Sequence, residues 1–192
     1  MKMQTGLSAF ALALTFASPA LAHTGHGAEG LVAGLSHPVF GPDHLLAMVA
    51  VGLWAGLVGG RSLWIWPASF VAAMLLGGVL GMAGVELPAI ELVIVGSVVA
   101  LGVAAALDLR PHLALGAAII GLFGLAHGNA HGLEAPVDGS GLGYAVGFVV
   151  ATAVLHGIGL GLALLTRGRF GARLTRGVGV VLALAGIGLI AS

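Results

Sequence analysis

The sequence predicts an all-α membrane protein in which six transmembrane helices follow a signal peptide. Two features of the composition predict this class: 59% of the 192 residues are hydrophobic, and only 7% are charged. A soluble globular domain has about 25% charged residues, so this chain lacks the charged surface that a soluble enzyme of its size needs. The third observation is that the apolar residues form stretches long enough to cross a bilayer.

The net charge and the cysteine count exclude further classes of protein. The seven basic and seven acidic residues give a formal charge of zero, which argues against nucleic-acid binding. The chain has no cysteine, so disulfides, thiolate metal sites and cysteine nucleophiles are excluded. The sequence contains no G-x-x-x-x-G-K-[ST] phosphate loop, and we therefore expect no ATP hydrolysis by this chain.

Residues 1–22 have the three-part pattern of a secretory signal peptide. Lys2 precedes an apolar stretch at residues 7–17, and a small-residue A-x-A cleavage site ends at Ala22. The apolar stretch is too short to cross a hydrocarbon core of about 30 Å comfortably, which favours cleavage over an uncleaved first helix. Cleavage after Ala22 leaves residues 23–34 as a short segment, rich in His and Gly, outside the cytoplasm.

Residues 35–192 form the expected membrane domain, with six apolar stretches separated by short polar breaks. A spanning helix needs about 17–25 residues, and the last stretch is the shortest of the six. Helices are expected because backbone groups in lipid must be hydrogen-bonded within their own segment. Trp64 and Trp66, at the start of the second span, are expected to be interface anchors. The predicted spans are residues 35–58, 63–83, 89–107, 113–133, 142–165 and 178–191.

The arginines predict how the chain is oriented in the membrane. If the mature N-terminus lies outside, three loops face the cytoplasm, and every arginine of the sequence lies in one of them. The opposite loops contain Glu86, Glu134 and Asp138 but no basic residue. We therefore expect both ends of the mature chain outside the cytoplasm. Asp108 is expected to form a salt bridge among the cytoplasmic arginines.

Glycines recur at every fourth position in several predicted spans. Small residues at this spacing allow helices to pack closely in a membrane. We expect these glycines to bring the first and fourth spans face to face. The repeats are Gly52, Gly56 and Gly60 in the first span, Gly124, Gly128 and Gly132 in the fourth, and the pairs Gly77 and Gly81, Gly143 and Gly147, and Gly157 and Gly161.

Two of the predicted spans contain ionisable residues, which are rare inside a membrane. A charged side chain at the centre of a spanning helix costs about 2.5–3.5 kcal/mol on insertion scales, so such residues are functional candidates. The first span contains the segment HPVFGPDH, and the fourth ends in HGNAHGLE. The candidate metal-binding residues are His37, Asp43 and His44 in the first segment and His127, His131 and Glu134 in the second.

Helix periodicity places each group of candidates on one helix face. His127 and His131 are four residues apart, the spacing of two imidazoles that share a metal ion, and Glu134 continues that face. His37 and His44 are seven residues apart, which is about 20° around an ideal helix. The two spans run in opposite directions, with both groups in the outer half. We therefore expect His44 level with His127, and His37 level with Glu134.

Pro38 and Pro42 complicate the first span, because neither has an N–H group and each disfavours helix at the preceding residue. Two conformations are open: a continuous helix, or a broken span in which Pro42 begins the membrane helix and His37 lies in a vestibule loop. In the broken span Asp43 lies in the first turn, where the helix dipole favours its ionised form. Both conformations leave the group at the outer end.

The types of ligand limit the choice of metal ion but do not select a single one. Imidazole with carboxylate suits nickel, cobalt, zinc, copper(II) or iron(II), whereas magnesium and calcium prefer oxygen ligands. Two uses of the site remain possible: a path for a transported ion, or a zinc site that activates water in an intramembrane hydrolase. Such a hydrolase needs Glu134 as its base, because the sequence lacks the adjacent glutamate of H-E-x-x-H. Haem ligation by His44 and His127 is disfavoured by the neighbouring carboxylates.

Three further histidines are weaker candidates for metal binding. His156 lies deep in the fifth span, as either a relay for the ion or a hydrogen-bonded packing residue. Cleavage after Ala22 gives His23 a free α-amine beside its imidazole, and those two nitrogens can chelate one ion. His26 adds a third nitrogen three residues later. These two residues are expected either to capture metal at the outer face or to belong to a tail with incidental histidines.

The two polar segments resemble the signatures of the HupE/UreJ family. HPVFGPDH matches its H-x5-D-H signature, and HGNAHGLEAP matches its H-G-x-A-H-G-x-E motif. The resemblance covers essentially the whole mature chain. It implies a bacterial inner-membrane permease with a signal peptide and six spans, associated with hydrogenase and urease gene clusters.

The resemblance also implies the substrate and the roles of the motif residues. It indicates uptake of nickel, or of cobalt as in some relatives, with no enzymatic activity and no permanently bound cofactor. His37, Asp43, His44, His127, His131 and Glu134 carry over as metal-handling residues. The expected partners are the divalent ion and the lipid bilayer, and no nucleic acid is expected. Whether the protein forms a homo-oligomer is left open.

Overall fold

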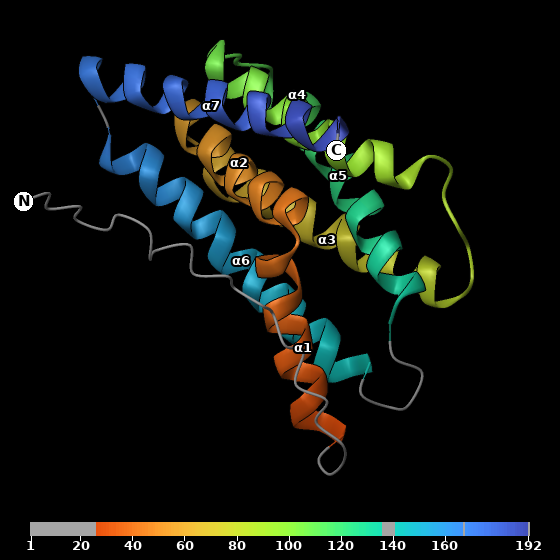
Figure 1. Ribbon diagram of the computed structural model, residues 1–192. Coiled ribbons are helices and arrows are strands. Elements are labelled where there is room, and N and C mark those ends of the chain that lie inside the picture. Colours follow the sequence, from red (N-terminus) through yellow and green to blue (C-terminus); the bar gives the residue numbers. More distant parts are fainter. Residues whose placement is uncertain (1–25, 136–140, 167, 192) are drawn as a thin grey trace, which may run out of the picture.

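The computed structural model describes residues 26–135, 141–166 and 168–191. The predicted signal peptide, its cleavage site, His23 and Asp138 lie outside the described residues, which form seven helices and are all-α, as predicted (Figure 1). The helices are α1 (His26–Phe40), α2 (Pro42–Val58), α3 (Ser62–Met82), α4 (Ile90–Ala106), α5 (Leu113–Leu133), α6 (Gly141–Leu165) and α7 (Arg169–Ile190).

The helices only partly support the predicted count of six spans. Among the described residues, α3, α5, α6 and α7 are each long and apolar enough to cross a membrane. The pair α1 and α2 passes the same test together and gives a fifth candidate. α4 is apolar but has 17 residues, at the lower limit for a spanning helix. Length and composition therefore support four or five spans, and the sixth depends on α4.

The first predicted span is broken at Gly41. The axes of α1 and α2 differ by 81°, and Pro42 begins α2, as expected for the broken conformation. His37 does not lie in a vestibule loop, because the residues before Gly41 form the separate helix α1 and include His37 in its last turn. The bend thus presents His37 and the first turn of α2 from two differently directed helices.

The last helix begins much earlier than predicted, at Arg169 rather than at residue 178. The arginine-rich stretch assigned to a loop forms the first turns of α7, since Arg, Leu and Ala are good helix formers. The Thr175 hydroxyl donates to the Gly171 carbonyl at 2.9 Å, and Arg176 Nε donates to the Ala106 carbonyl at 2.7 Å. The first bond lies within α7, and the second joins the start of α7 to the end of α4.

The expectation that glycines join the first and fourth spans is wrong. α5 packs on α3, α1 and α2 pack on α6, and α4 packs on α7 (Figure 1). A Cβ atom on Gly128 of α5 would collide with the Met74 carbonyl of α3, and one on Gly52 of α2 would collide with the His156 carbonyl of α6. Periodicity within one helix identifies a packing face but does not say which helix covers it.

Trp54 of α2 and Trp66 of α3 pack on each other at the end of the helix bundle opposite to the bend. Trp64 is exposed, but Trp66 is fully buried, so the expectation that Trp66 is an interface anchor is wrong. Gly116 of α5 leaves room for the Trp66 ring, whose Nε1–H donates to the Leu113 carbonyl at 3.0 Å. Trp66 also packs on Trp54, with ring centroids 4.6 Å apart.

The predicted salt bridge in the loop before α5 is confirmed. Arg110 Nε and Nη2 donate to the Asp108 carboxylate at 3.1 and 3.2 Å. His112 caps the N-terminus of α5, because its Nδ1 accepts from the Leu115 amide at 3.3 Å. The Asp108–Arg110 salt bridge and the His112 cap therefore stabilise the conformation of this loop.

Candidate metal centre

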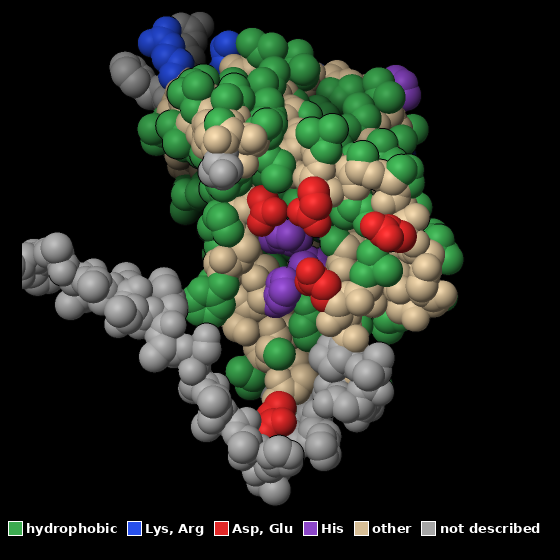
Figure 2. All heavy atoms as spheres, turned by 45° about the vertical axis from the view of Figure 1, so that its right-hand side comes forward, with side chains coloured by type: hydrophobic (Ala, Val, Ile, Leu, Met, Phe, Trp, Pro, Cys, Tyr) green, Lys and Arg blue, Asp and Glu red, His purple; other side chains and the backbone are tan. Residues whose placement is uncertain are grey.

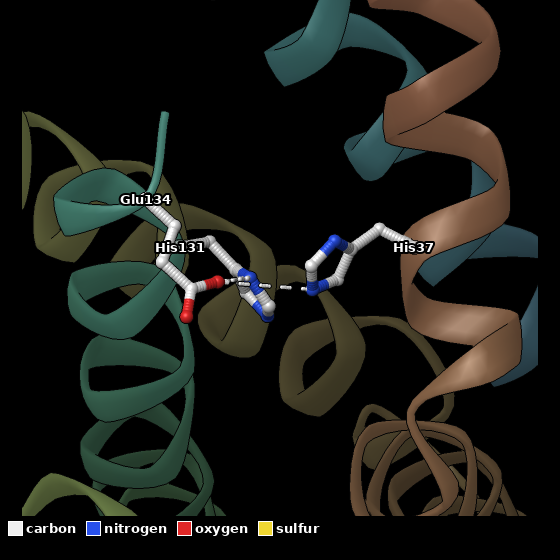
Figure 3. A group of neighbouring side chains, drawn as sticks. All are labelled: His37, His131 and Glu134. Atoms are coloured by element: carbon white, nitrogen blue, oxygen red, sulfur yellow. Dashed lines mark ion pairs between the residues drawn. The ribbon is translucent and has the colours of Figure 1, made fainter. Parts of the chain in front are cut away.

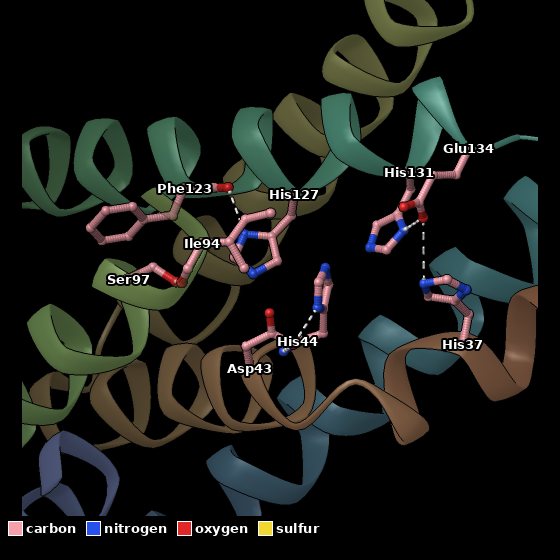
Figure 4. Close-up of polar contacts among 9 residues, drawn as sticks. All are labelled: His37, Asp43, His44, Ile94, Ser97, Phe123, His127, His131 and Glu134. Carbon is pink, nitrogen blue, oxygen red and sulfur yellow. Dashed lines mark hydrogen bonds and ion pairs between the residues drawn. The ribbon is translucent and has the colours of Figure 1, made fainter. Parts of the chain in front are cut away.

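Four histidines from three helices meet beside the bend between α1 and α2 (Figure 4). His37 comes from α1, His44 from α2, and His127 and His131 from α5. We call these four residues the histidine cluster. The ring centroids are 4.5 Å apart for His37 and His131, 4.4 Å for His44 and His131, and 4.9 Å for His44 and His127. His131 therefore lies between the residues of the first predicted motif.

One end of the cluster forms a three-ligand group, the outer triad of His37, His131 and Glu134 (Figure 3). Glu134 Oε2 lies 4.0 Å from His37 Nε2 and 3.9 Å from His131 Nδ1. One ligand atom from each residue lies within 4.8 Å of the other two. Imidazole and carboxylate ligands bind a transition metal at about 2.0–2.2 Å. Small side-chain movements would therefore bring all three onto one ion.

At the other end of the cluster, hydrogen bonds fix two imidazole tautomers. His127 Nδ1 lies 2.9 Å from the Phe123 carbonyl, which can only accept, so Nδ1 carries the proton. His44 Nδ1 lies 2.7 Å from Asp43 Oδ1, which likewise accepts. The Nε2 atoms of both rings are buried and have no hydrogen-bond partner among the described residues. Metal-binding histidines commonly donate their other N–H to a carboxylate or a carbonyl, so both rings have the arrangement of ligands.

Asp43 contributes to the site through His44. Its Oδ1 accepts from both the His44 ring and the His44 amide, the latter at 2.8 Å. Asp43 lies in the first turn of α2, where the helix dipole favours a carboxylate. In this arrangement the carboxylate orients the imidazole and strengthens it as a ligand.

Exposure falls steadily along the site. The Glu134 and His37 side chains are 66% and 39% exposed, those of His44 and His131 are 10% and 6% exposed, and His127 is fully buried. Figure 2 shows histidine side chains in a hollow of the surface, with acidic side chains around them. The surface next to Glu134 is hollowed by about 440 Å³. A cation can therefore reach the outer triad, while the deeper histidines are shielded from water.

The structure brings all six sequence-predicted residues into one site. His44 lies beside His127, and His37 lies beside Glu134, as the helical registers predicted. His156 lies apart from the cluster in α6, and the side chain of His26 is outside the described part. The binding of metal by these residues stays a prediction.

Sequence reasoning missed two supports of the site. Asn129 is fully buried; its amide nitrogen donates to the Val85 carbonyl at 2.8 Å, and its oxygen accepts from the Leu87 amide at 3.0 Å. It thus ties α5 to the segment between α3 and α4, and its polarity inside a span was the available signal. Phe148 of α6 covers His131 at a centroid distance of 4.3 Å, a contact without any signal in the sequence.

The fold and the site define a class of protein: a multi-pass helical membrane protein with a histidine-rich, metal-type site open at one end. The chain belongs to the HupE/UreJ family, whose model, described as HupE / UreJ protein, matches residues 11–189. It is 44% identical over 189 residues to Protein HupE of Rhizobium leguminosarum bv. viciae, covering 98% of this chain and 97% of that relative. No solved structure matches the chain.

Membership in this family decides between the two uses of the site that the sequence left open. The family is one of metal-transporting membrane proteins and not of enzymes. The intramembrane hydrolase is therefore rejected, and the histidines are to be understood as parts of a transport protein.

Proposed function

We propose that the protein is a permease for a divalent transition-metal ion, with nickel as its substrate and cobalt as the alternative. The observation that carries the proposal is a continuous series of imidazoles that leads from an exposed glutamate to a fully buried histidine. In the part of the chain that the structure describes, the Nε2 atoms of its two innermost rings, His44 and His127, are buried without a hydrogen-bond partner. An unsatisfied buried polar atom costs about 1–3 kcal/mol, a cost that a bound ion would remove.

In this proposal the ion is handed from one ligand set to the next. Glu134, His37 and His131 bind it first at the surface. His131 also lies 4.4 Å from His44, centroid to centroid, so it can remain bound while His44 replaces the outer ligands. His127 then takes part at the deepest point. Neighbouring rings at these separations allow the ion to exchange ligands one at a time.

The proposed orientation places the cluster on the periplasmic side of a bacterial inner membrane. Arg61 lies in the turn after α2 and Arg110 in the loop before α5, whereas the cluster lies at the start of α2 and the end of α5. Arginines and histidines thus occupy opposite ends of these helices, in agreement with the positive-inside rule. The proposal counts the bent pair and α4 as spans, which gives six after a cleaved signal peptide.

The choice of nickel and its destination rests on the family. Imidazole with carboxylate suits several divalent transition metals, and raw affinity alone would favour copper(II) over nickel. The HupE/UreJ resemblance favours nickel uptake that supplies the maturation of hydrogenase or urease. His23 and His26 are proposed as capture residues ahead of the path, and His156 as a residue beyond it.

The proposal is tested by uptake of radioactive nickel into cells that express the full chain, with cobalt, zinc and magnesium ions as competitors. We expect saturable uptake that cobalt inhibits and magnesium does not. His44→Ala and His127→Ala should each abolish uptake at unchanged abundance in the membrane, whereas His112→Ala should have no effect. Full uptake by both cluster variants would overturn the path.

A further inference from the structure

His156 is a buried histidine that the proposed path does not reach. It lies on α6, is 3% exposed, and neither ring nitrogen has a hydrogen-bond partner in the described structure. Buried polar side chains are normally hydrogen-bonded, so a packing role leaves both nitrogens unexplained. The backbone at His156 is fixed, because its carbonyl packs against Gly52 of α2.

One aromatic ring contacts both His156 and the histidine cluster. Phe70 of α3 is fully buried, and its ring centroid lies 5.1 Å from that of His156 and 5.3 Å from that of His127. The Phe70 backbone is held by Gly124 of α5, where a Cβ atom would collide with it. The Phe70 ring thus contacts both the innermost imidazole of the cluster, His127, and the imidazole of His156.

A cavity of about 350 Å³, open at the protein surface, lies between α3 and α6 and reaches His156. It is lined by α3 from Leu63 to Val71 and by α6 at Ala153, His156, Gly157 and Leu160. Leu63 is close to the α2–α3 turn that contains Arg61, at the end of α3 opposite to the histidine cluster. The cavity therefore extends from His156 toward the end of α3 that lies away from the outer triad. A Cβ atom on Gly157 would meet nothing within 4 Å, so a larger side chain there can enter this space.

We propose that His156 is an inner binding site for the same divalent ion and that the Phe70 ring is the barrier between it and the histidine cluster. The inference rests on the proposed function, because it extends the same path. A phenyl ring excludes water, offers no ligand and can interact with a cation through its face. Movement of this one ring would connect the two sites, and its return would close the path behind the ion.

The test uses the purified full chain, with Ni²⁺ as the probe. Equilibrium binding of Ni²⁺ in detergent reports the histidine cluster, and flux of ⁶³Ni²⁺ into lipid vesicles reports the complete path. We expect both His156→Ala and Gly157→Leu to keep the Ni²⁺ affinity of the histidine cluster within about two-fold of the unaltered chain and to lose at least about ten-fold in flux. His156→Ala should also bind less Ni²⁺ per chain at saturation. Gly161→Leu is the matched control, because this open position is not part of the cavity. It should change neither quantity.

The barrier is tested separately by the size of the side chain at position 70. Phe70→Ala should raise the flux several-fold and Phe70→Trp should lower it, with Ni²⁺ binding retained in both. Phe70→Leu replaces Phe70→Ala if the smaller side chain prevents folding. Equal losses of flux in the small and large variants would overturn the barrier.

The outcomes for the inner site and for the proposed function are distinct. Normal flux in both His156→Ala and Gly157→Leu would overturn the inner site, while flux that still depends on His131 would leave the proposed function intact. An unaltered chain that neither binds nor conducts Ni²⁺ would overturn the proposed function itself.

Discussion

The two sides of α5 are built in opposite ways. On one side, glycines bring its backbone against that of α3, and Cβ atoms on Gly124, Gly128 or Gly132 would collide with α3 carbonyls. On the other side, α5 meets α1 and α2 through imidazole rings rather than through backbone packing. His127 and Gly128 are neighbours in sequence but belong to different sides. The side of α5 that packs on α3 therefore positions the ligands, while the side that faces α1 and α2 leaves room for an ion to enter and move.

The largest effect is expected on the rigid side. Gly128→Leu places a side chain against the Met74 carbonyl, and a backbone atom cannot move aside as a flexible side chain can. We expect a loss of stability beyond the about 1–3 kcal/mol typical of an overpacked core. The measurement is the amount of folded protein recovered from the membrane. Gly161→Leu is the control, and equal recovery of both variants would contradict the rigid packing.

On the ligand side, a substitution should remove function but not the fold. His131→Ala removes the residue shared by the outer triad and His44, together with two buried nitrogens that have no hydrogen bond to any described residue. We expect at least a ten-fold loss of nickel uptake with an unchanged or higher melting temperature. A variant that retains uptake, or that loses uptake only because it unfolds, would count against the contrast between the two sides.

Asp43→Asn sharpens the distinction between a ligand and its support. The amide keeps the size of Asp43 and can still accept from the His44 ring, but it loses the charge. Mutation of a group that is hydrogen-bonded to a metal ligand typically costs about 10–100-fold in affinity, and here the charge of that group is lost. We therefore expect weaker nickel binding than in the unaltered chain but tighter binding than in His44→Ala, measured by titration. Asp108→Asn is the charge-matched control. Equal losses in Asp43→Asn and His44→Ala would place Asp43 among the direct ligands.

The smallest effect is expected from the N-terminal histidines. Residues that only capture the ion raise its local concentration without forming part of the path. Replacing His23 and His26 together with alanine should therefore reduce uptake when nickel is scarce and matter little when it is plentiful. Equal losses at both concentrations would place these residues in the path. N-terminal sequencing of the mature chain comes first, because the α-amine chelate requires a chain that begins at His23.

The sequence was sufficient for most of the helices and for the grouping of the six candidate residues, because both depend on local patterns. Apolar length located α3, α5 and α6 to within a residue or two, and the registers of two motifs placed His44 beside His127. The chemistry of Pro42 gave the break at Gly41 as one of two open conformations. These properties are encoded within a few turns of one helix.

Features that depend on which helices are neighbours were not predictable. The glycines of α5 identified a packing face but not α3 as its partner, and Trp66 is buried because Gly116 of another helix leaves room for it. The position of Phe70 between His127 and His156 depends on three helices at once. The role of Asp43 depends on a side-chain conformation that spacing does not reveal.

Whether the histidine cluster binds the ion is decided by X-ray absorption at the nickel edge. The samples are the purified full chain loaded with one equivalent of Ni²⁺ and a variant that carries both His44→Ala and His131→Ala. Because the outer triad and the deeper pair each contain two histidines, and the variant removes one from each, we expect at least two imidazole ligands in the unaltered chain and fewer in the variant. Nickel surrounded only by oxygen ligands, or an identical spectrum in the variant, would contradict it.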